Sequence, residues 1–230
     1  MVDFHAIRGT ADFIFMRHGE SEGNRERVAQ GRQPSRLTEQ GREQARAAGR
    51  ALARRPPDAV LSSPLTRALE TAEIAAKEFG AGDIMVCDEL MEIDTGIFTG
   101  LTFPQSHERH PKEWIEFHSR SWEAVPGAEK IEELTARAAS VWSRLIGMAG
   151  QGKRNILSVS HSGFIQWIVR VTFGLNAWMP LLDISRNCGI TLMRVDNKDL
   201  EDGSRSYYAN WAMINLPPEL AFPARAFPAG

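Results

Sequence analysis

Apolar runs alternate with helix-like patterns along most of this chain. Six short apolar or aromatic runs predict strands, at 13–16, 59–61, 84–86, 156–159, 189–195 and 206–214. Apolar residues at three- and four-residue steps predict helices between several of them, at 39–55, 64–79, 131–148 and 164–173. This alternation predicts an α/β fold, a three-layer α/β/α sandwich with a mostly parallel central sheet.

Residues with special backbone preferences mark where two of these helices begin. Thr38 is predicted to cap the first helix, which Pro56-Pro57 ends. Ser63 is predicted to cap the second helix, with Pro64 at its first position. The polar stretch 196–199 separates the last two strands and predicts a hairpin.

The sequence contains no internal repeat or low-complexity linker, so we expect a single domain over residues 1–230. Two segments depart from the alternation. Residues 101–128 hold three prolines and four aromatic side chains, and they predict a small helical insertion folded over one edge of the sheet. Residues 216–230 are rich in proline and are predicted to be extended or disordered.

Charge and cysteine content exclude several classes of protein. The chain has 27 basic and 29 acidic side chains, so its overall charge attracts neither nucleic acid nor an anionic membrane. Cys87 and Cys188 are too few and too far apart for a disulfide framework or a zinc site, which fits a reducing compartment. Residues 1–12 contain no sustained apolar stretch that would serve as a signal peptide or membrane anchor. We therefore expect a cytoplasmic protein.

Polar residues with catalytic potential follow four of the predicted strands. Arg17-His18 comes directly after the first strand and Arg67 soon after the second, while Glu92 follows the third and His161 the strand at 156–159. The carboxyl ends of parallel strands share one edge of a sheet, so these side chains should meet in one crevice. Such a set of cations is costly to desolvate unless an anion binds between them, and a phosphoryl group supplies that anion.

Five sequence segments, in this order, resemble the histidine phosphatase superfamily, which includes phosphoglycerate mutases and acid-phosphatase-like enzymes. They are Arg17-His18-Gly19-Glu20-Ser21 with Asn24, Leu37-Thr38-Glu39-Gln40-Gly41, Ser62-Ser63-Pro64-Leu65-Thr66-Arg67-Ala68, Leu90-Met91-Glu92-Ile93-Asp94, and Ser160-His161-Ser162-Gly163. The resemblance covers the chain from about residue 13 to residue 192.

The resemblance implies roles for the residues at the strand ends. His18 matches the nucleophile that becomes a phosphohistidine, and Arg17 and Arg67 match the arginines that hold the phosphoryl group. His161 matches the second histidine of the pocket. An attacking His18 must be neutral at its reacting nitrogen, whereas His161 would serve better as a charged donor.

Two further residues complete the implied site. Glu92 matches the proton donor to the leaving oxygen, although Glu89 and Glu20 also lie near strand ends. Asn24 matches a residue that helps to hold the phosphate or the neighbouring substrate. No metal ion and no cofactor are implied, since fixed guanidinium and imidazole groups can neutralise the charge that develops in phosphoryl transfer.

The chain also departs from the pattern of the superfamily. Pro34 and Arg36 stand where relatives usually have an Asp and a Pro, and Thr99 replaces an acidic residue. The segment Pro126-Gly127-Ala128-Glu129-Lys130 replaces the Pro-Gly-Gly-Glu-Ser often found in phosphatases. These positions lie near where the substrate is recognised, so the native substrate stays open.

A phosphatase that hydrolyses phosphate monoesters through His18 is the favoured interpretation. Phosphoglycerate mutases of the superfamily carry a longer and more basic insertion than residues 101–128, which instead contain Phe103, Trp114, Phe117 and Trp122. These aromatics predict a lid over a partly apolar leaving group, or they simply seat the insertion on the sheet. A mutase-like phosphotransferase and a phosphate-sensing protein without turnover are the alternatives.

We expect the partner to be a small phosphorylated metabolite, and a homodimer stays open. His107 and His110 lie three residues apart but lack a third metal ligand nearby, so a solvated loop is the better interpretation. Ser160-His161-Ser162-Gly163 lacks the Gly-x-Ser-x-Gly pattern of a serine hydrolase.

Overall fold

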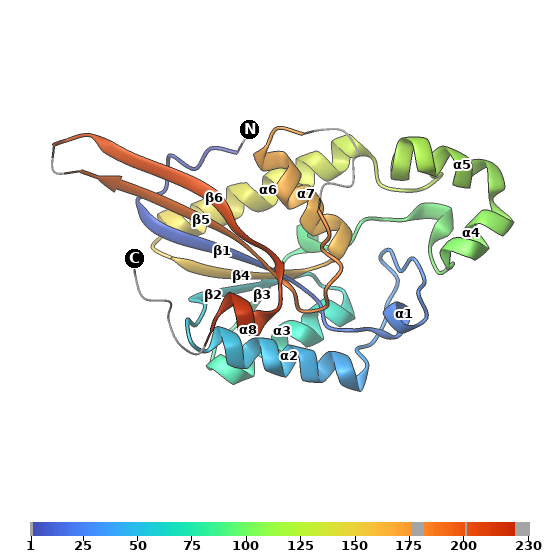
Figure 1. The fold of residues 1–230 in the computed structure, drawn as a ribbon, viewed down its shortest axis with the longest axis horizontal. Helices are drawn as coiled ribbons and strands as arrows, with labels where there is room; N and C mark the ends of the chain where they lie inside the picture. The colour runs from blue at the N-terminus through green and yellow to red at the C-terminus, as the bar shows by residue number, and fades with distance from the viewer. Residues whose placement is uncertain (1, 176–181, 201, 224–230) are drawn as a thin grey trace.

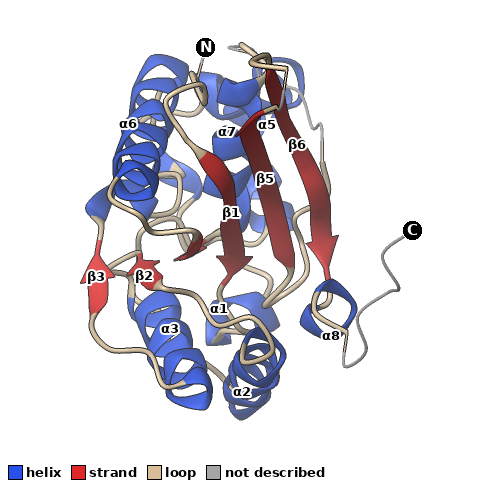
Figure 2. Cartoon of the chain, turned by 90° about the vertical axis from the view of Figure 1, so that its left-hand side faces the viewer, coloured by secondary structure: helices blue, strands red, loops and turns tan. Residues whose placement is uncertain are grey.

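A computed structural model of the chain describes residues 2–175, 182–200 and 202–223. Its central feature is a six-stranded sheet with the strand order β3-β2-β4-β1-β5-β6 (Figure 2). The strands are β1 (Gly9–Arg17), β2 (Ala59–Ser62), β3 (Ile84–Val86), β4 (Asn155–Ser160), β5 (Ile190–Asp199) and β6 (Arg205–Leu216). All six coincide with predicted strands, and β1 and β4 extend beyond their predicted ends.

Four strands of the sheet are parallel and two run against them. β3, β2, β4 and β1 are parallel neighbours, whereas β5 pairs antiparallel with β1 and β6 antiparallel with β5. β5 and β6 form the predicted hairpin, whose tip extends to the end of the molecule opposite α4 and α5 (Figure 1). The carboxyl ends of the four parallel strands therefore point toward α4 and α5. The predicted position of the hairpin turn was wrong, because residues 196–199 belong to β5 and pair with residues 205–208 of β6.

Helices cover both faces of the sheet, with α6 and α7 on one side and α2, α3 and α8 on the other (Figure 1). The α-helices are α1 (Glu22–Arg25), α2 (Glu39–Leu52), α3 (Thr66–Phe79), α4 (Phe103–Arg109), α5 (Pro111–Arg120), α6 (Ile131–Gly150), α7 (Ser162–Thr172) and α8 (Pro218–Ala221). Three 3-10 helices, η1 (Asp88–Leu90), η2 (Gly96–Phe98) and η3 (Ser121–Ala124), lie in the connections. The α/β/α sandwich predicted from the sequence is confirmed. No helix in the described part of the chain is both long and apolar enough to span a membrane.

Alternation of side chains along β1 produces the two layers of core. Phe13 and Phe15 contact Trp142 of α6, each with ring centroids 5.4 Å apart. Ile14 and Met16 point to the other face and belong to the core formed with α2 and α3. Because β1 is buried on both faces, its sequence is a continuous apolar run.

Two other predictions about local structure were wrong. Helix α3 begins at Thr66 rather than at Pro64, and Ser63 does not cap it. The chain after Leu216 is not simply extended, because Pro218 occupies the first turn of α8 and the side chains of Ala221 and Phe222 are buried against the core on the α2 side. Residues 224–230 of the Pro-rich tail lie outside the described residues.

The insertion at 101–128 folds into α4, α5 and η3 beyond the carboxyl ends of the parallel strands (Figure 1). It has its own small apolar cluster around the buried ring of Phe98, against which Trp114, Phe117 and Trp122 pack. The aromatic residues therefore hold the insertion in place. This is one of the two interpretations given above for the sequence.

Candidate active site

The strand ends bring the predicted residues together at one edge of the sheet. A pocket of about 200 Å³ there is lined by five of the six predicted site residues, namely Arg17, His18, Asn24, Arg67 and Glu92. The sixth, His161, lies behind them, with its ring centroid 5.1 Å from that of His18. Short connections after β1, β2 and β4 place the two histidines and Arg67, whereas Asn24 comes from α1 and Glu92 from the loop between η1 and η2.

The imidazole of His18 is oriented by contacts at both of its nitrogens. Nδ1 lies 2.7 Å from the carbonyl oxygen of Gly19, so it carries the proton and donates it. Nε2 accepts a hydrogen bond from Nε of Arg67 at 3.3 Å and therefore presents a lone pair. Burial, followed by the charges of Arg17 and Arg67, lowers the pKa of His18 well below 6.5. The neutral tautomer with a nucleophilic Nε2 is thus the favoured form.

Arg67 is held by the backbone of the loop that follows α1. Its Nη1 donates to the carbonyl oxygen of Gln33 at 2.9 Å and its Nη2 to that of Gly31 at 2.8 Å. Burial lowers the pKa of Arg67 to about 10, which leaves the guanidinium charged at neutral pH. Three of its donors are thus oriented before any ligand binds, which reduces the ordering that binding would otherwise require.

Arg17 lies on the other side of the histidine, at the end of β1. Its Nη1 donates to the carbonyl oxygen of Ser185, while its buried Nε has no hydrogen-bond partner among the described residues. Burial lowers the pKa of Arg17 from its usual value. Asn187, two residues beyond Ser185, donates from Nδ2 to the carbonyl oxygen of His18 at 3.0 Å and to Oδ1 of Asn24 at 3.2 Å. The segment before β5 therefore fixes three site residues, and the sequence analysis did not identify it.

His161 follows β4 at the N-terminal end of α7 and is fully buried. Its Nε2 lies 2.8 Å from the hydroxyl of Ser63, and its Nδ1 has no hydrogen-bond partner among the described residues. Burial and the charge of Arg67 lower the pKa of His161 well below 6.5. A further buried cation beside the two arginines is unfavourable, so the neutral form of His161 is favoured and a charged His161 would need an anion in the pocket.

Glu92 is held at the N-terminal end of α7. Oε1 accepts hydrogen bonds from the backbone N–H groups of Ile93 at 2.9 Å and Phe164 at 3.0 Å, and Oε2 accepts from Gly163 at 3.3 Å. A Cβ atom at Gly163 would lie only 2.7 Å from Oε1. The glycine therefore allows the carboxylate to approach the helix terminus, and this explains its place after His161 in the sequence.

The loop that carries Glu92 is held by an ion-pair network that the sequence analysis missed. Arg137 of α6 donates to the carbonyl oxygens of Glu89 and Met91, and it forms a bidentate pair with the buried Glu129 at 2.7 Å. Arg32 donates to the same carboxylate at 2.9 Å. Glu129 lies in the segment that departs from the phosphatase pattern, yet its carboxylate positions the backbone on either side of Glu92.

Phe103 and Trp122 also line the pocket, whereas Trp114 and Phe117 do not. The rings of His107 and His110 lie tilted against aromatic rings, with centroids 5.9 Å from Trp114 and 6.1 Å from Phe98 respectively. Within the described ranges, no group of three or more His, Cys, Asp or Glu side chains lies close enough together to hold a metal ion.

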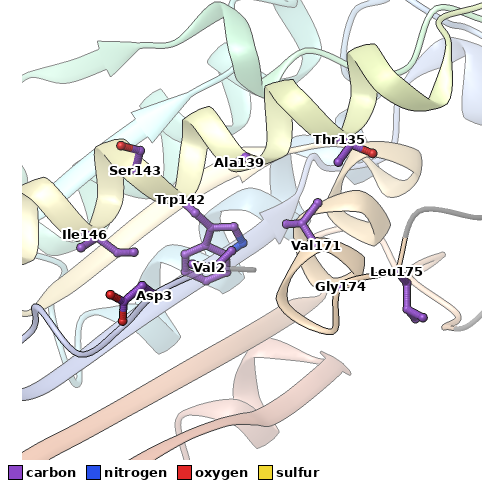
Figure 3. A pocket seen from close by; sticks show the side chains of 10 residues that line it. All are labelled: Val2, Asp3, Thr135, Ala139, Trp142, Ser143, Ile146, Val171, Gly174 and Leu175. Atoms are coloured by element: carbon purple, nitrogen blue, oxygen red, sulfur yellow. The ribbon is translucent and has the colours of Figure 1, made fainter.

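A hollow of about 490 Å³ lies elsewhere, between α6, the end of α7 and the N-terminal segment (Figure 3). Its lining is mostly apolar, with Trp142 and Ile146 on α6 and Val171 on α7, and Asp3 is the one charged side chain among the described residues that line it. The described residues that line this hollow include none of the groups that phosphoryl chemistry needs. The pocket at the strand ends is therefore the candidate active site, although it is the smaller of the two cavities.

Comparison with known proteins agrees with this fold and arrangement of residues. The family model of the histidine phosphatase superfamily (branch 1) matches residues 13–201 of the chain. The chain therefore belongs to this superfamily, as its sequence motifs predict.

Relatives in the superfamily have different names. "Bifunctional protein Rv2228c" of Mycobacterium tuberculosis is 37% identical over 169 residues, which cover 71% of this chain and 45% of the relative. This chain thus spans less than half the length of that relative. "Phosphoglycerate mutase-like protein 4" of Arabidopsis thaliana is 33% identical over 159 residues, covering 68% of each chain. Among solved structures, native mycobacterial glucosyl-3-phosphoglycerate phosphatase superposes with a TM-score of 0.75 at 25% identity, covering 90% of this chain and 99% of its own.

Proposed function

We propose that this protein is a phosphatase that hydrolyses phosphate monoesters through a phosphohistidine on His18. The observation that carries the proposal is the orientation of His18. Its Nε2 lone pair is directed at Nε of Arg67, beside which it lines the pocket, and its Nδ1 proton is held by Gly19. A neutral imidazole that is fixed in this way can attack phosphorus without first losing a proton.

The proposed reaction has two steps. In the first, Nε2 of His18 forms a bond to phosphorus while the bond from phosphorus to the ester oxygen breaks, and Glu92 gives a proton to the departing alcohol. In the second, water attacks the phosphohistidine, Glu92 takes its proton, and phosphate leaves with His18 restored. Glu92 gives up a proton in the first step and takes one from water in the second, so the enzyme ends in the protonation state in which it began.

The surrounding donors would stabilise the charge that spreads over the phosphoryl oxygens. Arg17 and Arg67 supply fixed positive charge on two sides, and Nε of Arg17 is a buried donor that lacks an acceptor among the described residues. Oδ1 of Asn24 is already occupied by Ser21 and Asn187, so its amide N–H₂ is the end left for a ligand. A dianion in the pocket would also favour proton uptake by His161. These groups supply the electrostatics without a metal ion or cofactor.

Hydrolysis is preferred over transfer to a second substrate because of what the pocket lacks. Apart from Arg17 and Arg67, the described residues that line it include no lysine or arginine. A phosphoglycerate carries a carboxylate besides its phosphate, and such a group would have no cation to meet it here. The substrate we propose is a small phosphorylated metabolite with a single strongly anionic group.

Nitrophenyl phosphate hydrolysis, measured with and without a chelator, tests the proposal. We expect turnover by the wild type that the chelator leaves unchanged, and a loss of at least a thousandfold in His18→Ala. His118→Ala, which alters an exposed histidine of α5, is the matched control and should keep full activity. Turnover that survives His18→Ala or needs a divalent metal would contradict the proposal, and tight phosphate binding without turnover would favour a phosphate sensor.

A further inference from the structure

We infer that the pocket selects monoesters of uncharged aromatic alcohols, with Phe103 and Trp122 as the residues that recognise the leaving group. The inference rests on the proposed function and specifies its substrate class. The described residues that line the pocket combine the cations Arg17 and Arg67 with several apolar side chains.

Five of the described residues that line the pocket are apolar or aromatic. Val28, Ala29 and Ile93 line it together with Phe103 and Trp122. Two polar side chains of the lining, those of Thr95 and Gln30, use an oxygen in hydrogen bonds within the protein. The hydroxyl of Thr95 is hydrogen-bonded to that of Thr99 at 2.7 Å, and Oε1 of Gln30 accepts from Ser21 at 3.0 Å.

Two nearby arginines outside the pocket are engaged with a carboxylate of the protein. Arg32 and Arg137 both pair with Glu129, at 2.9 Å and 2.7 Å, and neither lines the cavity. A second phosphate or a carboxylate on the substrate would therefore lose its hydration without gaining a charged partner. The site thus discriminates against substrates with two anionic groups.

The two aromatic rings are in place before a substrate binds. Phe103 is the first residue of α4, whose start is fixed by reciprocal hydrogen bonds between Thr102 and Gln105, and its ring is 51% exposed. Trp122 packs edge-on against Phe117 at 4.7 Å and against Phe98 at 6.2 Å. An aromatic leaving group that covers these two rings would gain binding free energy, because the rings are already ordered and lose little freedom on binding.

The shape of the backbone next to Trp122 supports a fixed position for this ring. Ser121 has φ 54° and ψ −150°, a conformation that is nearly restricted to glycine, and its side chain is buried. The next residue, Trp122, lines the pocket. The cavity volume of about 200 Å³ suits a phosphoryl group with one ring rather than a long or branched alcohol.

The test compares phenyl phosphate with 4-(carboxymethyl)phenyl phosphate, whose leaving groups have similar basicity but differ by one negative charge. We expect kcat/KM to be at least tenfold higher for phenyl phosphate. Methyl phosphate is the third substrate, since it carries no ring. Phe103→Ala and Trp122→Ala should each lower kcat/KM for phenyl phosphate by about tenfold, with a much smaller effect on methyl phosphate and on inhibition by inorganic phosphate.

Ile115→Ala is the matched control, because Ile115 is an exposed apolar residue of the same insertion that does not line the pocket. It should change neither substrate. Equal kcat/KM for the two aryl esters, or equal losses on phenyl and methyl phosphate in both variants, would overturn the inference while leaving the phosphatase proposal intact. A wild type that hydrolyses none of the three esters would overturn both.

Discussion

Arg67 donates a hydrogen bond from Nε to Nε2 of His18, the nitrogen that the proposed mechanism joins to phosphorus. The two groups are 3.3 Å apart and both are buried. This contact keeps the lone pair of His18 directed toward the guanidinium. When Nε2 bonds to phosphorus, a phosphoryl oxygen would replace Nε2 as the hydrogen-bond acceptor for Arg67. The backbone carbonyls of Gly31 and Gln33 hold Arg67 throughout.

Arg67→Lys should lower kcat by about a hundredfold or more although it keeps the charge. Lysine has one nitrogen in place of a planar fork and cannot donate to Gly31, Gln33 and His18 in the same geometry. Steady-state kinetics with nitrophenyl phosphate measure the loss. Arg42→Lys, a surface change on α2, serves as the control and should have wild-type activity. An Arg67→Lys enzyme within threefold of wild type would show that the fork is unimportant.

Glu92 can be tested both directly and through the residue that makes room for it. Glu92→Gln should slow hydrolysis of alkyl phosphates far more than that of nitrophenyl phosphate, because only poor leaving groups need a proton. Gly163→Ala should show the same selectivity in weaker form, since its Cβ would push against Oε1 of Glu92. Gly147→Ala on α6, where a Cβ meets nothing within 4 Å, is the control. Equal losses on both substrates would remove Glu92 from the role of acid.

Acidification should destabilise the protein through its two buried histidines. The pKa values of His18 and His161 are both well below 6.5 in the folded state, so the unfolded chain binds more protons as the pH falls below about 6.5. Each histidine should then cost about 1.4 kcal/mol of unfolding free energy per pH unit, until the pH passes its folded pKa. The loss is absent above pH 6.5.

Urea unfolding at pH 7.5, 6.5 and 5.5 measures this dependence. His161→Asn should reduce the slope between pH 6.5 and 5.5, whereas His118→Asn, which replaces an exposed histidine, should not. A wild-type stability that is flat or rises on acidification over this range would mean that the two histidines are charged in the folded protein.

The sequence was sufficient to predict the layers of the fold and the meeting of the site residues at one edge of the sheet. Apolar runs and residue composition mark all six strands. Residues directly after parallel strands necessarily meet at one edge of the sheet. Arg17, His18 and His161 follow their strands without any intervening loop, so their positions required no knowledge of tertiary contacts. Arg67 and Glu92 lie further along but still near strand ends.

Other contributions depend on contacts that no local pattern records. Ser185 and Asn187 reach the site only because β5 pairs antiparallel with β1, with Ile190 opposite Met16. The groups that hold Arg67 are backbone carbonyls of Gly31 and Gln33, which residue types do not reveal.

Two local misassignments have similar causes. Ser63 matches the pattern of a helix cap before proline, but its hydroxyl lies against His161 and accepts a hydrogen bond from Leu65 instead. The proline-rich stretch after Leu216 was interpreted as unstructured, although Pro218 begins a helix that buries Ala221. In both cases a tertiary contact decided between two uses of the same residue type.

The most direct test of the central claim is to trap the phosphoryl group on the protein. Rapid acid-free quenching during turnover of nitrophenyl phosphate, followed by peptide mass spectrometry under alkaline conditions, locates an acid-labile phosphate. The account predicts one phosphorylated peptide with the group on His18, absent from His18→Ala and longer-lived in Glu92→Gln. Phosphate on another residue, or turnover with a phosphoryl-free His18 under conditions that preserve phosphohistidine, would contradict it.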